Sequence, residues 1–390
     1  METIARLNLL SEQMRFEPDA DVRPDGVPVL PSNCLAKHIN DVFITPAVMP
    51  NGRRIKLLKT QLSSVCERDC NYCAFRAGRD FRRASFRPEE FARMFLELHR
   101  RGIAEGLFVS SGIAGGGAAT QDRLIATAEI LRLKLGYRGY LHLKIMPGAE
   151  RAQVERSMQL ADRVSINLEA PNTESLARLA PHKTFSEELL TRLRWVDEIR
   201  RTQPEQRGWN GRWPSSTTQF VAGGADESDL ELLQTTEYLY RALRLKRAYF
   251  MAFSPVPDTP LEGHAPTPAG RELRLYQASF LLRDYGFSME EMPFEADGRL
   301  PLRVDPKLAW AQHNLGEQPL EVNRADRTQL LRVPGIGPKG ADAILRLRRQ
   351  ARIRDLAALR ALGVLAERAA PFLLLDGKKA PYQMSLELVA

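Results

Sequence analysis

The chain has 390 residues, of which 44% are hydrophobic and 27% charged, the ordinary balance of a globular protein with one large domain and a smaller one, or two to three domains. No apolar run approaches the roughly 20 residues that a membrane-spanning helix needs. The first residues lack the apolar stretch and cleavage site of a secretory signal, so we expect a cytoplasmic protein without membrane contact. The net charge of +8 permits a nucleic-acid partner but does not establish one.

The first 45 residues show no strong periodicity and are rich in Pro and Asp between Pro18 and Pro31. We expect residues 1–45 to form an N-terminal cap with one short helix. From residue 54 onward, strand-like apolar runs alternate with helical stretches. The predicted strands are Arg54–Ser63, Gly106–Ser111, Tyr140–Met146, Arg163–Leu168, Ser216–Val221 and Ala248–Ser254. The predicted helices are Pro88–Arg101, Asp122–Leu135, Ala152–Asp162, Thr184–Thr202, Glu227–Leu243 and Thr267–Asp284.

Six βα repeats predict an α/β core with a parallel sheet over residues 46–300, either partly closed as a barrel or open and doubly wound. In both arrangements the active groups gather at the carboxyl ends of the strands. The alternation stops near residue 295, and short helices around a Gly/Pro hairpin follow Pro306. We therefore place a boundary between Gly298 and Pro306, a small all-α module at 301–370 and a tail at 371–390.

Three of the four cysteines lie within the sequence CERDCNYC, directly after the first predicted strand. Thiolates are the usual ligands of iron–sulfur clusters, and three close cysteines leave one iron of a four-iron cubane open to a ligand with an amino-acid chelate. The alternatives are buried structural thiols, or zinc, which usually takes four ligands. Cys34 could be a fourth zinc ligand, but it stands far upstream without a partner.

The spacing of Cys66, Cys70 and Cys73, with Tyr72 as the aromatic residue before the last cysteine, resembles the signature of the radical S-adenosylmethionine (radical SAM) superfamily. The resemblance implies that these cysteines hold a [4Fe–4S] cluster whose open iron is chelated by S-adenosylmethionine. An electron from the cluster then yields a 5′-deoxyadenosyl radical, which abstracts hydrogen from a substrate. We expect a partial (βα)6 TIM-like barrel for this core and an electron donor such as flavodoxin or ferredoxin.

The ends of the later strands resemble the family's cofactor contacts. Where the superfamily has a Gly-Gly-Glu-like segment that faces the methionine amine, this chain has Ser-Ser-Gly after the second strand and lacks the acid. Asn-x-Glu after the fourth strand resembles the superfamily's ribose-binding residues. A Gly-Gly pair after the fifth strand and FSPVPDTPL after the sixth resemble the adenine side. The resemblance thus assigns cofactor contacts to Tyr72, Ser110, Ser111, Gly112, Asn167, Glu169, Gly223 and Gly224. Taken singly, such glycine turns and Asn-x-Glu pairs are also routine βα turns and helix caps.

Basic residues surround the predicted site. Lys144 ends the third strand, and it contacts either a carboxylate or phosphate group or the solvent alone. Five arginines follow the cysteines and would either grip an anion or form a solvated loop. They are Arg76, Arg79, Arg82, Arg83 and Arg87.

The sequence LLRVPGIGPKGADAILRLRRQ predicts two helices joined by a tight turn, with the first helix at Asp326–Arg332. Gly335 and Gly337 permit the turn, the next helix N-terminus can bind a phosphate, and Lys339 adds a charge. Residues 321–350 contain seven Lys or Arg and three Asp or Glu. This pattern is similar to helix–hairpin–helix DNA-binding modules, although a docking hairpin would look the same. Residues 352–364 look like the start of a second copy without its glycine hairpin.

Five segments together resemble a bacterial family of radical SAM proteins with a C-terminal helix–hairpin–helix, described as DNA modification or repair proteins. They are GLFVSSGI, YLHLKIMPGA, DRVSINLEAP, TTQFVAG and LLRVPGIGPKGA. The resemblance implies a radical enzyme acting on nucleic acid, DNA above all. A base in a duplex would have to be extruded to react. The alternatives are the same chemistry on a small molecule or protein, with the hairpin used for docking, and a binding protein with a structural metal.

Overall fold

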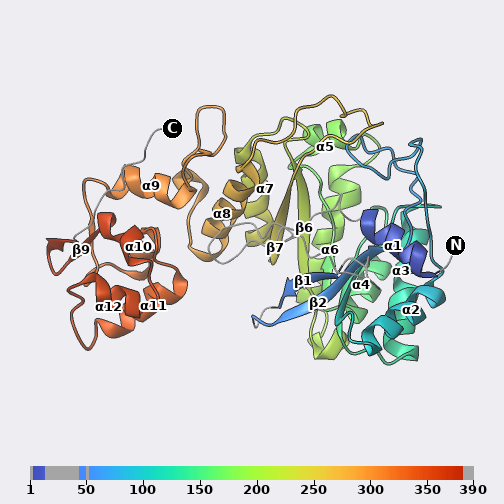
Figure 1. Cartoon of the computed structure of the whole chain (residues 1–390), viewed down its shortest axis with the longest axis horizontal. Helices are drawn as coiled ribbons and strands as arrows, with labels where there is room; N and C mark the ends of the chain where they lie inside the picture. The colour runs from blue at the N-terminus through green and yellow to red at the C-terminus, as the bar shows by residue number, and fades with distance from the viewer. Residues whose placement is uncertain (1–2, 14–43, 50–51, 381–390) are drawn as a thin grey trace. The chain divides into compact units, whose positions relative to one another are not determined.

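The computed structural model describes residues 3–13, 44–49 and 52–380 (Figure 1). The chain divides into two compact units, one up to Glu272 and one from Leu273. This division lies upstream of the predicted boundary at 298–306. The division falls near the start of helix α8 (Arg271–Asp284), so most of α8 and the residues after it belong to the second unit, where Phe287 meets Trp310 with ring centroids 5.7 Å apart.

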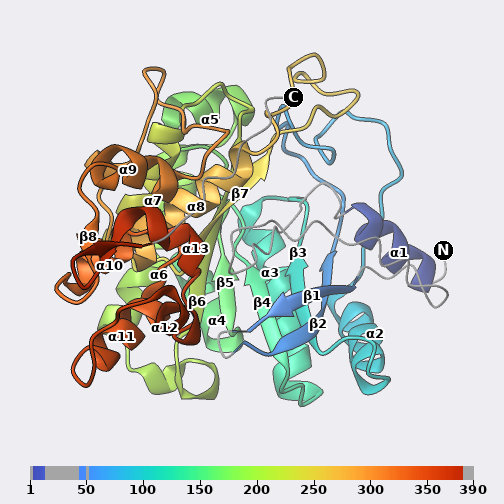
Figure 2. The same cartoon turned by 60° about the vertical axis from the view of Figure 1, so that its left-hand side comes forward.

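The first unit is built on a seven-stranded sheet whose strands lie in chain order, β1 to β7. All neighbours are parallel except β1 and β2, which are antiparallel. The sheet is curled, as in a half-barrel, and helices cover its outer face (Figure 2). The strands are β1 (Ile44–Val48), β2 (Arg54–Gln61), β3 (Gly106–Ser110), β4 (Tyr140–Lys144), β5 (Arg163–Ser165), β6 (Ser215–Ala222) and β7 (Arg247–Ala252). The six predicted strands are thereby confirmed, whereas β1 was not predicted.

The helices of the first unit largely follow the predicted stretches, apart from α5, which the sequence did not reveal. Two of the predicted helices contain a π-helical segment, at residues 130–134 and 185–190. The helices are α1 (Thr3–Gln13), α2 (Pro88–Arg100), α3 (Gly117–Glu129), α4 (Arg151–Leu160), α5 (Thr173–Leu179), α6 (Thr191–Thr202) and α7 (Asp229–Ala242). Helix α8 begins in this unit and continues into the second.

Local sequence accounts for these elements. In α2, Pro88 occupies the first turn, and Phe91 and Phe95 recur at helical spacing and are fully buried, as expected for an amphipathic helix. In α7, Ser228 and Glu231 form a reciprocal capping box. On the helix-facing side of the sheet the strand residues are apolar and buried, so the core lies between the sheet and its helices.

The predicted N-terminal cap can be described only in part. Helix α1 contacts α2 through Arg6, which pairs with Glu90 and lies 4.5 Å from the centroid of the Phe86 ring. Residues 14–43, including Cys34, lie outside the described residues. Among those that are described, no helix is long and apolar enough to cross a membrane.

Among its described residues the second unit contains most of α8, five further α-helices and a small three-stranded sheet of order β10-β9-β8. They are α9 (Pro306–Leu315), β8 (Leu320–Glu321), α10 (Arg327–Arg332), α11 (Pro338–Leu347), α12 (Leu356–Ala361), α13 (Ala366–Ala369), β9 (Leu373–Leu375) and β10 (Lys378–Lys379). The prediction of an all-α module followed by a tail was therefore wrong. Leu373 and Leu375 are buried, and Asp376 and Gly377 both adopt positive φ, as the turn of a tight β-hairpin requires.

Candidate cofactor site and hairpin unit

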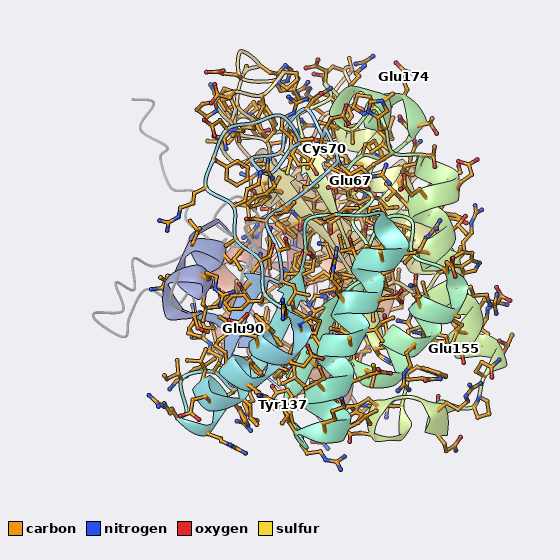
Figure 3. All side chains as sticks on the ribbon, turned by 90° about the vertical axis from the view of Figure 1, so that its right-hand side faces the viewer. Glu67, Cys70, Glu90, Tyr137, Glu155 and Glu174 are labelled. Atoms are coloured by element: carbon orange, nitrogen blue, oxygen red, sulfur yellow. The ribbon has the colours of Figure 1, made fainter. Side chains whose placement is uncertain are left out.

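The three clustered cysteines lie on an irregular loop between β2 and α2, at the carboxyl end of the parallel strands. Figure 3 shows Cys70 and Glu67 near one end of the first unit and Tyr137 near the other. Cys66, Cys70 and Cys73 line a common cavity with the ends of β3 and β4. Burial raises the pKa of the Cys70 thiol, and it raises that of Cys73 well above its usual value. In the described part of the chain, no three or more His, Cys, Asp or Glu side chains are placed so that they could together hold a metal ion.

Arginines hold this loop in place. Arg83 donates hydrogen bonds to the carbonyl oxygens of Ser64 (2.9 Å), Phe75 (3.1 Å), Arg76 (2.8 Å) and Arg79 (3.3 Å). Arg79 binds the carbonyls of Ala74 and Pro257, and Arg76 binds that of Asp69. Three of the five arginines considered as anion ligands thus have a structural role in the loop.

Two further side chains tie the loop to its neighbours. Glu67 accepts hydrogen bonds from the backbone N–H groups of Gly115 (2.9 Å) and Gly116 (3.1 Å), beyond the end of β3. At the end of α5, the Asn71 side chain donates to Arg178 O at 2.8 Å, and the Asn71 backbone N–H donates to Leu179 O at 2.7 Å. The cysteine loop is therefore fixed to two βα connections as well as to its own backbone.

A buried lysine that the sequence did not single out lies beside the cysteines. Lys183 Nζ is 3.0 Å from Glu169 Oε1, and the side chains are 8% and 7% exposed. Burial lowers the pKa of Lys183, but the negative charges of Cys70 and Glu169 outweigh it, so the pKa is raised above its usual value. Lys183 was missed because it follows α5, away from any strand end.

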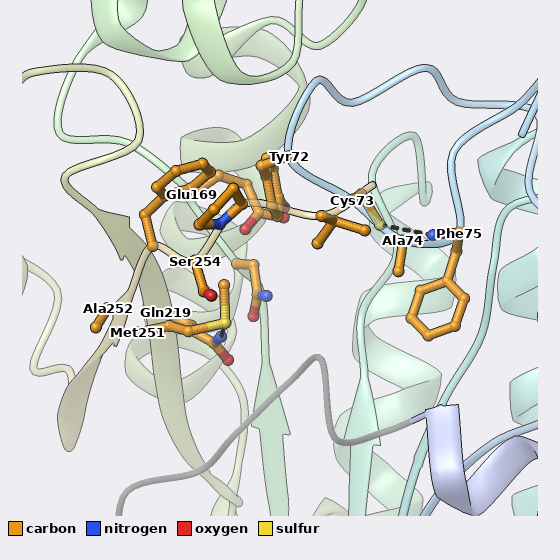
Figure 4. A pocket seen from close by; sticks show the side chains of 13 residues that line it. Tyr72, Cys73, Ala74, Phe75, Glu169, Gln219, Met251, Ala252 and Ser254 are labelled. Carbon is orange, nitrogen blue, oxygen red and sulfur yellow. Dashed lines mark hydrogen bonds between the residues drawn. The ribbon is translucent and has the colours of Figure 1, made fainter. Parts of the chain in front are cut away.

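Most of the predicted cofactor contacts meet in two adjoining cavities. Ser110, Ser111, Gly112 and Lys144 line the cavity of the cysteines. Ser254 and Met251 at the end of β7 line the other, where Tyr72 and Glu169 lie together above Gln219 and Met251 (Figure 4). Five residues border both cavities, namely Tyr72, Cys73, Phe75, Asn167 and Glu169. The cysteines and the strand ends therefore share one continuous site.

Asn167 and Glu169 are held in different ways. Asn167 Oδ1 accepts a hydrogen bond of 2.7 Å from Lys144 Nζ, so Lys144 has a neutral protein partner at the cavity. Glu169 adopts a positive φ of 66°, an uncommon conformation for a non-glycine residue. Its backbone N–H donates to Gln219 O (3.0 Å), and its carbonyl accepts from Val221 N (2.7 Å). Bonds to β6 thus compensate the backbone conformation that places this carboxylate in the site.

Gly223 and Gly224 are not among the residues that line these cavities. Gly223 has a φ of +92°, and a Cβ atom there would lie 2.3 Å from Thr267 Oγ1. A Cβ atom at Gly224 would lie 2.8 Å from a side-chain carbon of Leu179. Close packing within the first unit is therefore the visible reason for both glycines, and their contact with a cofactor stays a prediction.

The site fits an iron–sulfur cluster and S-adenosylmethionine. The three thiols are the donor type that such clusters use. Gln61 is 2% exposed and borders the cysteine cavity, and its side-chain oxygen has no hydrogen-bond partner among the described residues. A buried acceptor of this kind calls for a ligand donor. A Cβ atom at Gly112 would lie 2.3 Å from Val65 O, so this glycine permits the close approach of the cysteine loop to β3.

The second unit forms a compact hairpin between α10 and α11. Asp326 caps α10 in a capping box, and Gly335 has a φ of +84°. A Cβ atom at Gly335 would lie 2.4 Å from Leu365 O, whereas at Gly337 its nearest neighbour would be Tyr285 Oη at 3.4 Å, an ordinary contact. Lys339 is exposed. Gly335 is thus required by the fold, but Gly337 is not.

A second hairpin follows the first. Helices α12 and α13 flank Gly363, whose φ of +76° is close to the +84° of Gly335, so a glycine does stand at this turn, contrary to the prediction. Leu365 N donates to Gly335 O at 3.1 Å, and the two hairpins pack on each other. Two residues after Gly363, where the first hairpin has Gly337, stands Leu365, which is 61% exposed.

Comparison with solved structures finds several distant similarities. The hydrogenase maturase HydG is 12% identical, with a TM-score of 0.45, and the alignment covers 58% of this chain and 49% of that one. Methylornithine synthase PylB is 17% identical, with a TM-score of 0.46, and the alignment covers 60% of this chain and 63% of that one. A radical SAM methyltransferase from Sphaerobacter thermophilus is 16% identical, with a TM-score of 0.43, and the alignment covers 60% of this chain and 69% of that one. The chain thus spans less than two thirds of the length of the first two structures. No curated protein sequence matches the chain.

A family model gives a direct assignment. Residues 60–202 match the model described as the radical SAM superfamily. The matched region runs from the end of β2 to the end of α6 and contains the three cysteines, Asn167, Glu169 and Lys183. Residues 60–202 are therefore similar to the radical SAM superfamily, whose members use a [4Fe–4S] cluster and S-adenosylmethionine as cofactors.

Proposed function

We propose that this enzyme cleaves S-adenosylmethionine reductively and directs the resulting radical at a nucleic acid, DNA above all. The nucleic acid would be bound by the hairpin of α10 and α11 in the second unit. The observation that supports the radical step is the shared site in which three cysteines adjoin the polar strand ends. The observation that supports the substrate is Gly337, a glycine at the start of α11 for which the described residues around it create no steric need. DNA repair or modification is the role that fits both.

Cys66, Cys70 and Cys73 would hold the cluster. When bound, the cofactors supply an electron and the 5′-deoxyadenosyl radical. Lys183 places a positive charge beside the thiolate of Cys70 and keeps the Glu169 carboxylate in position. Asn167 and Glu169 offer an amide and a carboxylate to a ribose diol, since together they can donate and accept hydrogen bonds.

The electron must come from a partner. The chain contains four cysteines, three of which are in the cluster motif, so a second cysteine-bound cluster has no ligands in this sequence. We propose a flavodoxin or ferredoxin as the donor. Support would be 5′-deoxyadenosine formation with reduced flavodoxin or ferredoxin and no added chemical reductant.

The hairpin unit offers one phosphate contact of a defined kind. The first backbone N–H groups of α11 have no partner within the helix, and a helix N-terminus favours an anion. Gly337 keeps a side chain away from them, and the exposed Lys339 adds a charge. Arg332 does not take part, because both sides of its guanidinium bind Glu291 at 2.7 Å. Such contacts to the backbone position a nucleic acid without reading its sequence.

A salt-dependent gel-shift titration with single-stranded and duplex DNA and with RNA tests this assignment. We expect Gly337→Val and Lys339→Gln to weaken binding of every sequence alike, and Lys339→Gln to reduce the salt slope by about 1. Lys378→Gln, at an exposed lysine of β10 in the same unit, is the matched control and should bind as wild type does. Negligible affinity at low salt, or affinity unchanged by Gly337→Val, would rule out a nucleic-acid substrate held in this way.

A further inference from the structure

The connection between α5 and α6, residues 178–188, lies against the loop that carries the cysteines. Arg68 of the loop donates to His182 O at 2.6 Å and forms an ion pair with Glu188 at 2.5 Å. His182 Nδ1 lies 2.7 Å from Asp69 Oδ2. These contacts add to the two hydrogen bonds between the loop and the end of α5 that are described above. The connection is thus fixed to the cysteine loop at both of its ends.

A π-helical segment follows this connection directly. It comprises residues 185–190 and precedes the first residue of α6. Such segments are rare and occur frequently at functional sites. Lys183, two residues before it, donates its backbone N–H to Ala180 O at 2.9 Å. Glu188, within the segment, is only 14% exposed where it pairs with Arg68. The backbone on both sides of Lys183 is therefore held in place.

The side chain of Lys183 reaches the cavity that the three cysteines line. There it forms the buried ion pair with Glu169 that is described above, and buried charges are screened much less by salt and water than exposed ones. Burial raises the pKa of the Cys70 thiol. Among the charges that act on this thiol, Lys183 lowers the pKa more strongly than Glu169 raises it. Lys183 therefore favours negative charge at Cys70.

A fixed charge beside a cluster ligand has a predictable effect on electron transfer. An iron–sulfur cluster becomes more negative by one charge when it accepts an electron. Its reduction potential depends on net charge, on hydrogen bonds to the sulfur atoms and on solvent exposure. A buried cation stabilises the reduced form more than the oxidised form, and a buried anion does the opposite. Lys183 and Glu169 should therefore shift the potential in opposite directions.

We propose that Lys183 raises the reduction potential of the cluster and that Glu169 lowers it, so that this pair sets how readily the cluster accepts an electron. In this step the cluster gains one electron, the flavodoxin or ferredoxin proposed above loses one, and no bond forms or breaks. Lys183 acts through its charge and needs no contact with a substrate. The proposal rests on the cluster of the proposed function, but not on the nucleic-acid substrate.

A redox titration of the anaerobically reconstituted full chain, without S-adenosylmethionine and followed by electron paramagnetic resonance of the reduced cluster, tests the proposal. We expect Lys183→Gln to lower the potential and Glu169→Gln to raise it. Each should change the equilibrium constant of one-electron reduction at least tenfold, which is about 59 mV. Lys183→Arg keeps the charge and should stay closer to wild type than Lys183→Gln. Lys134→Gln, at an exposed lysine outside both cavities, is the matched control and should leave the potential unchanged.

The opposite signs separate an effect of charge from a disturbed loop, because a disturbed loop would shift both potentials in the same direction. Shifts of the same sign in Lys183→Gln and Glu169→Gln would overturn the proposal, as would wild-type potentials in both. If only one of the two variants binds iron, its shift decides, and any sign other than the expected one overturns the proposal. A wild-type chain that binds no iron would instead contradict the proposed cluster, so iron content distinguishes the two failures.

Discussion

The ammonium of Lys183 lies 3.0 Å from a carboxylate oxygen of Glu169, and both side chains are buried beside Cys70. Removing one partner of a buried ion pair leaves an uncompensated charge, which costs roughly 3–5 kcal/mol. We expect Lys183→Met to lower the free energy of unfolding of the cluster-free chain by about that amount, measured by urea denaturation. Adding Glu169→Gln should recover part of the loss, because the two effects are coupled.

The exposed pair of Glu97 in α2 and Arg101, the residue directly after this helix, is the matched control. Glu97→Gln should cost no more than about 0.5 kcal/mol, since exposed pairs contribute little. A Lys183→Met chain as stable as Glu97→Gln would show that the buried pair does not organise the site.

Gly112 permits the close approach of the cysteine loop to the end of β3. In Gly112→Ala the new Cβ would lie 2.3 Å from Val65 O, next to Cys66, so the loop must move. We expect a lower iron content after anaerobic reconstitution. Gly263→Ala, where nothing lies within 4 Å of an added Cβ, should load as wild type does. Equal iron in both variants would mean that the loop tolerates displacement.

Substitutions at the two hairpin glycines of the second unit, Gly335 and Gly363, distinguish the cost of backbone strain from the cost of a steric clash. Gly335 and Gly363 both have positive φ, but only Gly335 faces a backbone atom, Leu365 O at 2.4 Å. We expect Gly363→Ala to cost about 1–2 kcal/mol through its backbone conformation, and Gly335→Ala to cost clearly more. Hydrogen exchange of the α10 and α11 amides in the full chain measures the stability loss caused by each substitution. Equal losses would mean that the two hairpins do not pack as described.

Lys307 should give the second unit a pH-dependent stability. It donates to Ile336 O at 2.6 Å. Burial lowers its pKa to about 7, the nearby Asp305 opposes this, and Arg368 and Arg332 reinforce it. Between about pH 7 and 10.5 the unfolded chain therefore binds one proton more than the folded one, so stability should rise with pH by up to about 1.4 kcal/mol per pH unit. Below pH 7 Lys307 is protonated in both states, and this contribution to the slope vanishes.

Hydrogen exchange of α11 in the full chain, followed across this window, measures the effect. Lys307→Met removes the titrating group, so its profile should be flatter than that of wild type, whatever its absolute stability. The same slope in wild type and Lys307→Met would assign the pH dependence to another group.

The sequence predicted the sheet and the location of the site because both depend on local patterns. Alternating apolar runs gave β2 to β7, and the shared edge of a parallel sheet brought Ser110, Asn167 and Glu169 to the cysteines. Lys183 could not be found in this way, since it reaches the site from the far side of α5 through tertiary packing. Gly223 and Gly224 followed the strand-end rule, yet the structure shows them packed against Thr267 and Leu179.

The central claim is that the three clustered cysteines support reductive cleavage of S-adenosylmethionine. Its most direct test is the iron content and the 5′-deoxyadenosine yield of the anaerobically reconstituted full chain, in wild type and Cys70→Ala, with cofactor and reductant supplied. We predict about four irons per wild-type chain and 5′-deoxyadenosine, with both lost in Cys70→Ala. A wild-type chain that binds zinc in place of iron and forms no 5′-deoxyadenosine would contradict the account.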